Sequence, residues 1–209
     1  HFGPPQKETV IVNHAELFLP LGSTAEIPNM APFLEEVRKL SKTKGYIASH
    51  EYFIREGEKL GHTIVNTDPF HPGIFLTIEQ PSIGAVTDYL RTVNFATGEV
   101  SASWNEGSQQ FRRNLFASRT DGAIVMSIFS SDTIPELCLS VEKIDHELID
   151  ATYNVEDTTI KGHHTYKHGN NGYESFVEIV CHDGDISSNK QGITIRNTKE
   201  VLLFIKIIP

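Results

Sequence analysis

Residues 89–104 read YLRTVNF, then ATGE, then VSASW, and this stretch decides the fold class. On the second arm Val100, Ala102 and Trp104 alternate with Ser101 and Ser103, which is the period-two pattern of a strand with one buried face. The ATGE segment holds a glycine and suits a turn. The stretch therefore predicts one strand, a turn and a returning strand.

Similar runs extend outward on both sides. The predicted strands cover residues 9–12, 74–79, 89–95, 100–104, 109–117, 123–129, 137–144, 157–161, 173–182, 192–196 and 200–208. Strands at intervals of about ten residues, with Gly, Asn and Asp between them, are typical of antiparallel sheets in a sandwich or barrel. We expect a mostly β fold, a large antiparallel two-sheet sandwich, because a sheet this extensive must bury one face against another layer.

Residues 31–60 break this pattern near the N-terminus. Apolar residues recur there at helical spacing in two runs, Phe33 to Leu40 and Ile47 to Leu60. Gly45 follows the first run and Gly61 the second, where a glycine commonly ends a helix. The sequence predicts a short two-helix insertion in an otherwise β domain.

Composition excludes some partners. The formal net charge is -9, and an acidic surface repels phosphate backbones, so we expect no nucleic-acid partner. No segment approaches the roughly 20 apolar residues of a membrane span, so no membrane contact is expected. The two cysteines, Cys138 and Cys181, lie in strand-like runs, which favours buried thiols and leaves a disulfide open.

Candidate chemical sites are few. His163, His164 and His168 cluster in sequence, but neighbours in a strand point to opposite faces, so a solvated loop is favoured over a metal site. Glu79, Asp88 and Asp121 lie near strand ends, and nothing marks them as a catalytic pair. We therefore predict no metal, no cofactor and no catalytic residue in this chain.

Trp104 and His71 are the candidate sugar contacts, because aromatic rings stack on pyranose rings. Trp104 shares one strand face with Val100 and Ala102, while Ser101 and Ser103 take the other. That parity favours a buried, structural Trp104. An exposed Trp104 acting as a sugar platform is the competing interpretation.

Ordered motifs give a family resemblance that covers nearly the whole chain. The quoted segments are VTDYLRTVN at 86–94, GEVSAS at 98–103, FRRNLFASRTDGAIVM at 111–126, FHPGIFLTI at 70–78 and NTKEVLLF at 197–204. They resemble the N-terminal domain of glycoside hydrolase family 95, the inverting α-L-fucosidases. Thr120 stands where that family usually has proline.

The resemblance implies that residues 1–209 form a single super-β-sandwich domain with a helical insertion at about 31–60. It implies a catalytic (α/α)6 barrel downstream on the same polypeptide, absent from this chain, and a carbohydrate substrate, with fucosides first and galactosides or arabinosides next. The chain would buttress that barrel and be inactive alone. Secretion or a periplasmic location is favoured by the resemblance only. Both ends of the chain look cut, so we expect a fragment.

Two further expectations remain. Arg91, Arg112 and Arg113 lie in predicted strands, where pairing with Asp88 or Asp121 across the sheet would hold its register. The functional alternative to a barrel-supporting domain is a free-standing carbohydrate-binding module, recognisable by a concave sheet face with exposed aromatics.

Overall fold

The computed structural model describes residues 3–22, 28–62 and 67–209. These divide into two compact units, one formed by residues up to 19 together with 70–209, and one formed by residues 20–69. Among the described residues no helix is both long and apolar enough to cross a membrane. Each unit is described separately.

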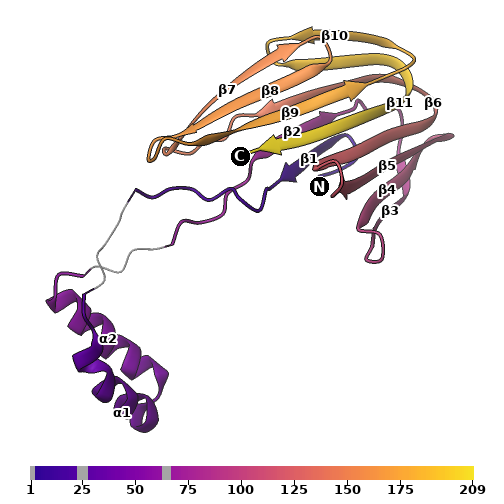
Figure 1. Cartoon of the computed structure of the whole chain (residues 1–209). Helices are drawn as coiled ribbons and strands as arrows, with labels where there is room; N and C mark the ends of the chain where they lie inside the picture. Colours follow the sequence, from indigo (N-terminus) through magenta and orange to yellow (C-terminus); the bar gives the residue numbers. More distant parts are fainter. Residues whose placement is uncertain (1–2, 23–27, 63–66) are drawn as a thin grey trace. The chain divides into compact units, whose positions relative to one another are not determined.

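Among the described residues of the larger unit, the regular elements are all strands (Figure 1). Its strands are β1 (Lys7–Val12), β2 (Ile74–Glu79), β3 (Val86–Asn94), β4 (Glu99–Glu106), β5 (Gln109–Ser118), β6 (Ala123–Glu142), β7 (Ile149–Glu156), β8 (Thr159–Tyr166), β9 (Gly172–Val180), β10 (Asp185–Asn189) and β11 (Gly192–Ile208). Every pairing between them is antiparallel. The expected mostly β, antiparallel fold class is confirmed.

Two long strands, β6 and β11, belong to both layers of the sandwich. The main path runs β3-β4-β5-β6-β11-β9-β8-β7, while β1 and β2 attach to β6, and β10 attaches to β11. The first half of β6 pairs with β5 and its last residues pair with β2. A register shift between Thr198 and Glu200 marks the corresponding place in β11. In Figure 1, β1 and β2 lie against the part of the sheet formed by β11 and β9.

The core lies between these layers and follows strand parity. In β4 and β11 every second residue is buried over long stretches, because side chains alternate between the two faces of a strand. Fully buried members include Leu76 of β2, Met126 of β6 and Leu203 of β11. Gly73 shows how close the layers are, because a Cβ there would stand 2.5 Å from Ile207 and 2.8 Å from Leu17.

The smaller unit holds a 3-10 turn at Ala31–Phe33 and two helices, α1 (Leu34–Lys44) and α2 (Tyr46–Lys59). Gly45 joins them at φ 86°, a conformation that favours glycine. The two-helix insertion is therefore confirmed close to its predicted bounds. The two helices contact each other, and the buried residues of α2 include Ser49 and Gly57.

Several predicted strands are wrong in extent. The segments 123–129 and 137–144 are one continuous strand, β6, and 192–196 and 200–208 are likewise one strand, β11. Strands β7 and β10 were not predicted. Their sequences, IDATYNVE and DISSN, contain the Asp, Asn and Ser residues that usually mark turns, and here they lie on outward faces.

Candidate functional site

Trp104 is buried, as its strand parity predicts. Its side chain is 2% exposed and stacks on Phe111 with ring centroids 5.3 Å apart. The indole Nε1–H donates a hydrogen bond to Glu106 at 3.0 Å. The ring therefore presents no open face for a sugar in this structure, although Trp104 contributes to the lining of a surface depression described below. Its predicted sugar contact stays a prediction.

A buried ion pair lies next to Trp104. Arg113 donates to a Glu8 carboxylate oxygen at 2.7 Å, and both side chains are at most 2% exposed. Arg91 reaches the other Glu8 oxygen at 3.1 Å. Desolvation lowers the pKa of Arg113, and the Glu8 carboxylate opposes that effect. The ion pair ties β5 to β1, the strand of the opposite layer.

The expected pairing of the arginines with Asp88 or Asp121 is wrong. Asp88 accepts from Asn105 at 2.8 Å, and Asp121 accepts from Ser118. Glu79, the third candidate carboxylate, pairs with Lys7. Cross-strand neighbours along the sheet could be inferred from sequence, but the partner of Arg113 comes from 105 residues away. The three carboxylates thus have three separate partners.

His71 lies in a buried cluster of two histidines and three tyrosines. Its Nε2 and the Tyr166 hydroxyl share a hydrogen bond of 2.7 Å. The His164 ring stacks on Tyr173 with centroids 4.0 Å apart, and His164 Nε2 shares a hydrogen bond of 3.0 Å with the hydroxyl of Tyr153. We call these five residues the His–Tyr cluster. It links β7, β8 and β9 to the segment before β2, and sugar contact by His71 stays a prediction.

Both histidines of this cluster are held neutral. Burial lowers the pKa of His71, and it lowers the pKa of His164 from 6.5 to about 4. Burial also raises the pKa values of Tyr153, Tyr166 and Tyr173. The cluster therefore carries no charge near neutral pH and acts as a polar link inside the core.

Acid should destabilise the fold through His164. Between pH 6.5 and about 4 the unfolded histidine binds a proton and the folded one does not, so stability is complete above this range and falls as the pH drops through it. At about 1.4 kcal/mol for each pH unit, the loss approaches roughly 3 kcal/mol. Urea unfolding at pH 7.5, 5.5 and 4.5 measures it.

The adjacent histidine supplies the control for that measurement. His164→Phe should flatten the pH dependence, whereas His163→Phe should keep it, because His163 points outward and is exposed. An unchanged slope in the His164 variant would contradict the assignment.

The cluster of histidines in sequence does not converge in space. His163 is exposed and His164 is buried, so they face opposite sides of β8. Within the described ranges, no group of three or more His, Cys, Asp or Glu residues is arranged to hold a metal ion. Cys138 and Cys181 are both free and partly exposed, so the expectation of buried thiols is wrong and no disulfide joins them.

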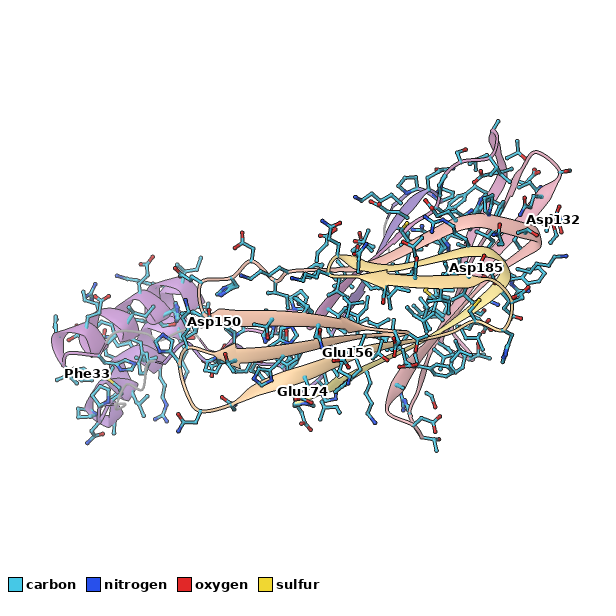
Figure 2. The ribbon with its side chains drawn as sticks, turned by 90° about the horizontal axis from the view of Figure 1, so that it is seen from above. Phe33, Asp132, Asp150, Glu156, Glu174 and Asp185 are labelled. Atoms are coloured by element: carbon cyan, nitrogen blue, oxygen red, sulfur yellow. The ribbon has the colours of Figure 1, made fainter. Side chains whose placement is uncertain are left out.

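Surface depressions lie along two parts of the sheet. One of about 620 Å³ lies at the β8–β9 hairpin, and another of about 520 Å³ shares His163 and Glu174 with it. Figure 2 labels Glu174 on β9 in this part of the sheet. The His163 Nδ1 and a Glu174 oxygen are 3.8 Å apart in an exposed pair. A third depression, of about 430 Å³, lies beside Trp104.

An apolar row crosses the outward face of β5, β6 and β11. Phe116 is the register partner of Val125, and Val125 is the register partner of Phe204. Both phenylalanines are about two-fifths exposed, at 42% and 39%. We call these three residues the Phe116 row. The sequence analysis missed this row. Leu115, Phe116 and Ala117 are consecutive apolar residues in a strand, which indicates that one of them lies on the outward face.

Comparison with known proteins decides the family. The family model described as "Glycosyl hydrolase family 65, N-terminal domain" matches residues 1–208. The chain belongs to this family. The family 65 match replaces the specific expectation of family 95, while the expectation of a glycoside hydrolase N-terminal domain is confirmed.

Solved structures add a distant likeness to this family 65 N-terminal domain. Fourteen chains match it. One is "Putative kojibiose phosphorylase from human microbiome", with 10% identity and a TM-score of 0.45 over 66% of this chain. The domain spans 23% of that protein's length. No curated protein matches the sequence.

Proposed function

We propose that this chain is a non-catalytic part of a larger glycoside hydrolase and packs against a catalytic (α/α)6 barrel on the same polypeptide. The observation that carries the proposal is the family 65 N-terminal domain match over residues 1–208. A domain that belongs at the N-terminus of a hydrolase needs a surface against which the catalytic part can pack.

The Phe116 row is the surface we assign to that contact. Phe116, Val125 and Phe204 form a continuous apolar strip by strand register. Exposed aromatic side chains that adjoin one another are typical of interfaces. Covering the exposed part of each phenylalanine contributes about 1 kcal/mol, from roughly 25 cal/mol for each Å² of apolar surface buried.

The reaction of the complete enzyme is hydrolysis of an O-glycosidic bond, with inversion and α-L-fucosides as the first substrate class to test. An inverting enzyme uses one carboxyl group as general acid and a second to activate water. Glu79, Asp88 and Asp121 serve local ion pairs and hydrogen bonds instead, so both groups are assigned to the barrel.

The Phe116 row can be tested in the polypeptide that contains the barrel. Phe116→Ser with Phe204→Ser should lower its melting temperature and its turnover of an aryl α-L-fucoside, because the two parts separate more easily. The same pair of changes should lower the stability of the isolated 209-residue chain by a smaller amount, since about two-fifths of each ring is already exposed there and no docking contact is lost. Differential scanning calorimetry and the hydrolysis rate give the two readings.

Ile11→Ser is the matched control, because Ile11 is 38% exposed on the opposite layer. It should leave the hydrolysis rate of the complete polypeptide unchanged. The isolated chain should show no turnover. Robust activity of the isolated chain, or a native gene without a downstream helical-repeat region, contradicts the proposal.

A further inference from the structure

Two adjacent arginines in β5 point to opposite faces of the sheet. Arg113 points inward to Glu8 and is 1% exposed. Arg112 points outward, where its Nε–H donates to Asn114 at 2.9 Å. Its two terminal nitrogens have no partner in the part of the chain that the structure describes. One arginine therefore secures the core, and the other presents free donors on the surface.

Arg112 lines the depression of about 430 Å³ beside Trp104. We call it the Arg112 depression. Its lining comprises Asp88, Ser103, Trp104, Asn105, Gln110, Phe111, Arg112 and Phe129. Strand register brings these residues together, because Ser103 pairs with Arg112, and Arg112 pairs with Phe129. The volume falls within the roughly 300–1,000 Å³ of sites for small molecules.

Asp88 reaches the rim of this depression through an irregular strand. The pairing of β3 with β4 shifts register between Thr87 and Leu90, and Asp88 adopts φ 53°, a left-handed conformation. Such bulges redirect a side chain, and strained residues of this kind concentrate at functional sites. The Asn105 amide donates to Asp88 Oδ2 at 2.8 Å, which fixes the orientation of the carboxylate.

The chemistry of the Arg112 depression selects a neutral, polyhydroxylated ligand. The Asp88 carboxylate accepts hydrogen bonds, the Arg112 guanidinium donates them, and Ser103 and Gln110 can do both. The charges of Asp88 and Arg112 cancel, so the site does not favour an anion or a cation. Phe129 is 44% exposed and offers a ring face to the C–H groups of a sugar.

We propose that the Arg112 depression binds a neutral pyranose unit of a glycan. Asp88 and Arg112 hydrogen-bond its hydroxyl groups, and Phe129 packs on its apolar face. The site belongs to this chain alone and does not depend on the docking of a barrel. In this arrangement the sugar binds beside Trp104 while the indole itself stays buried.

The single tryptophan makes the test direct. In the 15N-labelled chain the indole N–H of Trp104 gives one resonance, because the sequence has one Trp, and Trp104 lines the depression. Methyl α-L-fucoside, lactose and maltotriose are titrated separately. At least one should shift that resonance along a saturable curve, with a dissociation constant of about 1 mM, as expected for a shallow site.

Substitutions at the depression locate the binding. Arg112→Gln and Phe129→Leu should each weaken it about tenfold, since each removes a principal contact. Phe116→Leu is the matched control, because Phe116 lies on the same face with nearly equal exposure but outside the depression. It should leave the dissociation constant unchanged.

The remaining outcomes overturn the proposal. These are the absence of a saturable shift with all three sugars, or binding that survives Arg112→Gln and Phe129→Leu. Binding abolished by Phe116→Leu alone would place the sugar elsewhere and also overturn it. Absence of sugar binding would not contradict the proposed barrel contact, because that contact is tested by the hydrolysis rate and melting temperature of the complete polypeptide.

Discussion

Glu8→Gln should destabilise the larger unit by about 3–5 kcal/mol, because it leaves the buried charge of Arg113 without its carboxylate. Arg113 and Glu8 are 1% and 2% exposed, so solvent cannot replace the lost partner. Arg113 Nε already lacks a hydrogen-bond partner. Arg113 also donates to the carbonyl of Pro5 and the side chain of Gln80, and both contacts depend on its present position. Urea unfolding of both proteins measures the difference.

Glu79→Gln is the matched control for this change. Glu79 also pairs with a cation at 2.7 Å, but both side chains of that pair are more than half exposed. An exposed ion pair contributes about 0–1 kcal/mol, so the control should unfold near the parent protein. Equal losses in the two variants would show that burial of Glu8 is not what gives its ion pair its strength.

Trp104→Ala should lower the free energy of unfolding of the larger unit by about 3–5 kcal/mol. The change removes a large buried ring that stacks on Phe111 and lies 4.9 Å from the Arg113 guanidinium. It also takes one donor from Glu106, which is 1% exposed. A domain whose total stability is about 5–15 kcal/mol would lose a large share of it. Thermal unfolding followed by circular dichroism gives the magnitude.

Fluorescence of the parent protein checks the premise of the Trp104 prediction. A buried indole emits toward the blue and resists quenching by acrylamide. Phe204→Ala is the control for the unfolding measurement. The Phe204 ring is 39% exposed, so its removal should lower the free energy of unfolding by less than half as much as Trp104→Ala. Red-shifted, freely quenched emission from Trp104 would mean that the ring is accessible after all.

Most of the fold prediction rested on the alternation of apolar and polar side chains along the strands. The segment at 100–104 predicted the inward direction of Trp104, because parity depends only on neighbours in sequence. The two helices were predicted from equally local features, namely apolar residues at helical spacing and the glycines Gly45 and Gly61 at the helix ends. The continuity of β6 and β11 was missed, since Ser130 to Thr133 in β6 and Asn197 to Lys199 in β11 look like turns.

The site was less predictable because its contacts are not local. Nothing in the sequence near Arg113 indicates Glu8, and the Phe116 row exists only through pairing of three strands. Family resemblance supplied the glycoside hydrolase assignment but chose family 95 where the match is to family 65. Shared strand motifs specify a similar sandwich, and they say little about which sugar the enzyme cleaves.

Because β6 and β11 run through both layers, we expect the two layers to unfold together. Unfolding one layer would remove hydrogen bonds from β6 and β11, which are also strands of the other layer. The larger unit should consequently behave as one cooperative entity, with its calorimetric enthalpy equal to its van't Hoff enthalpy.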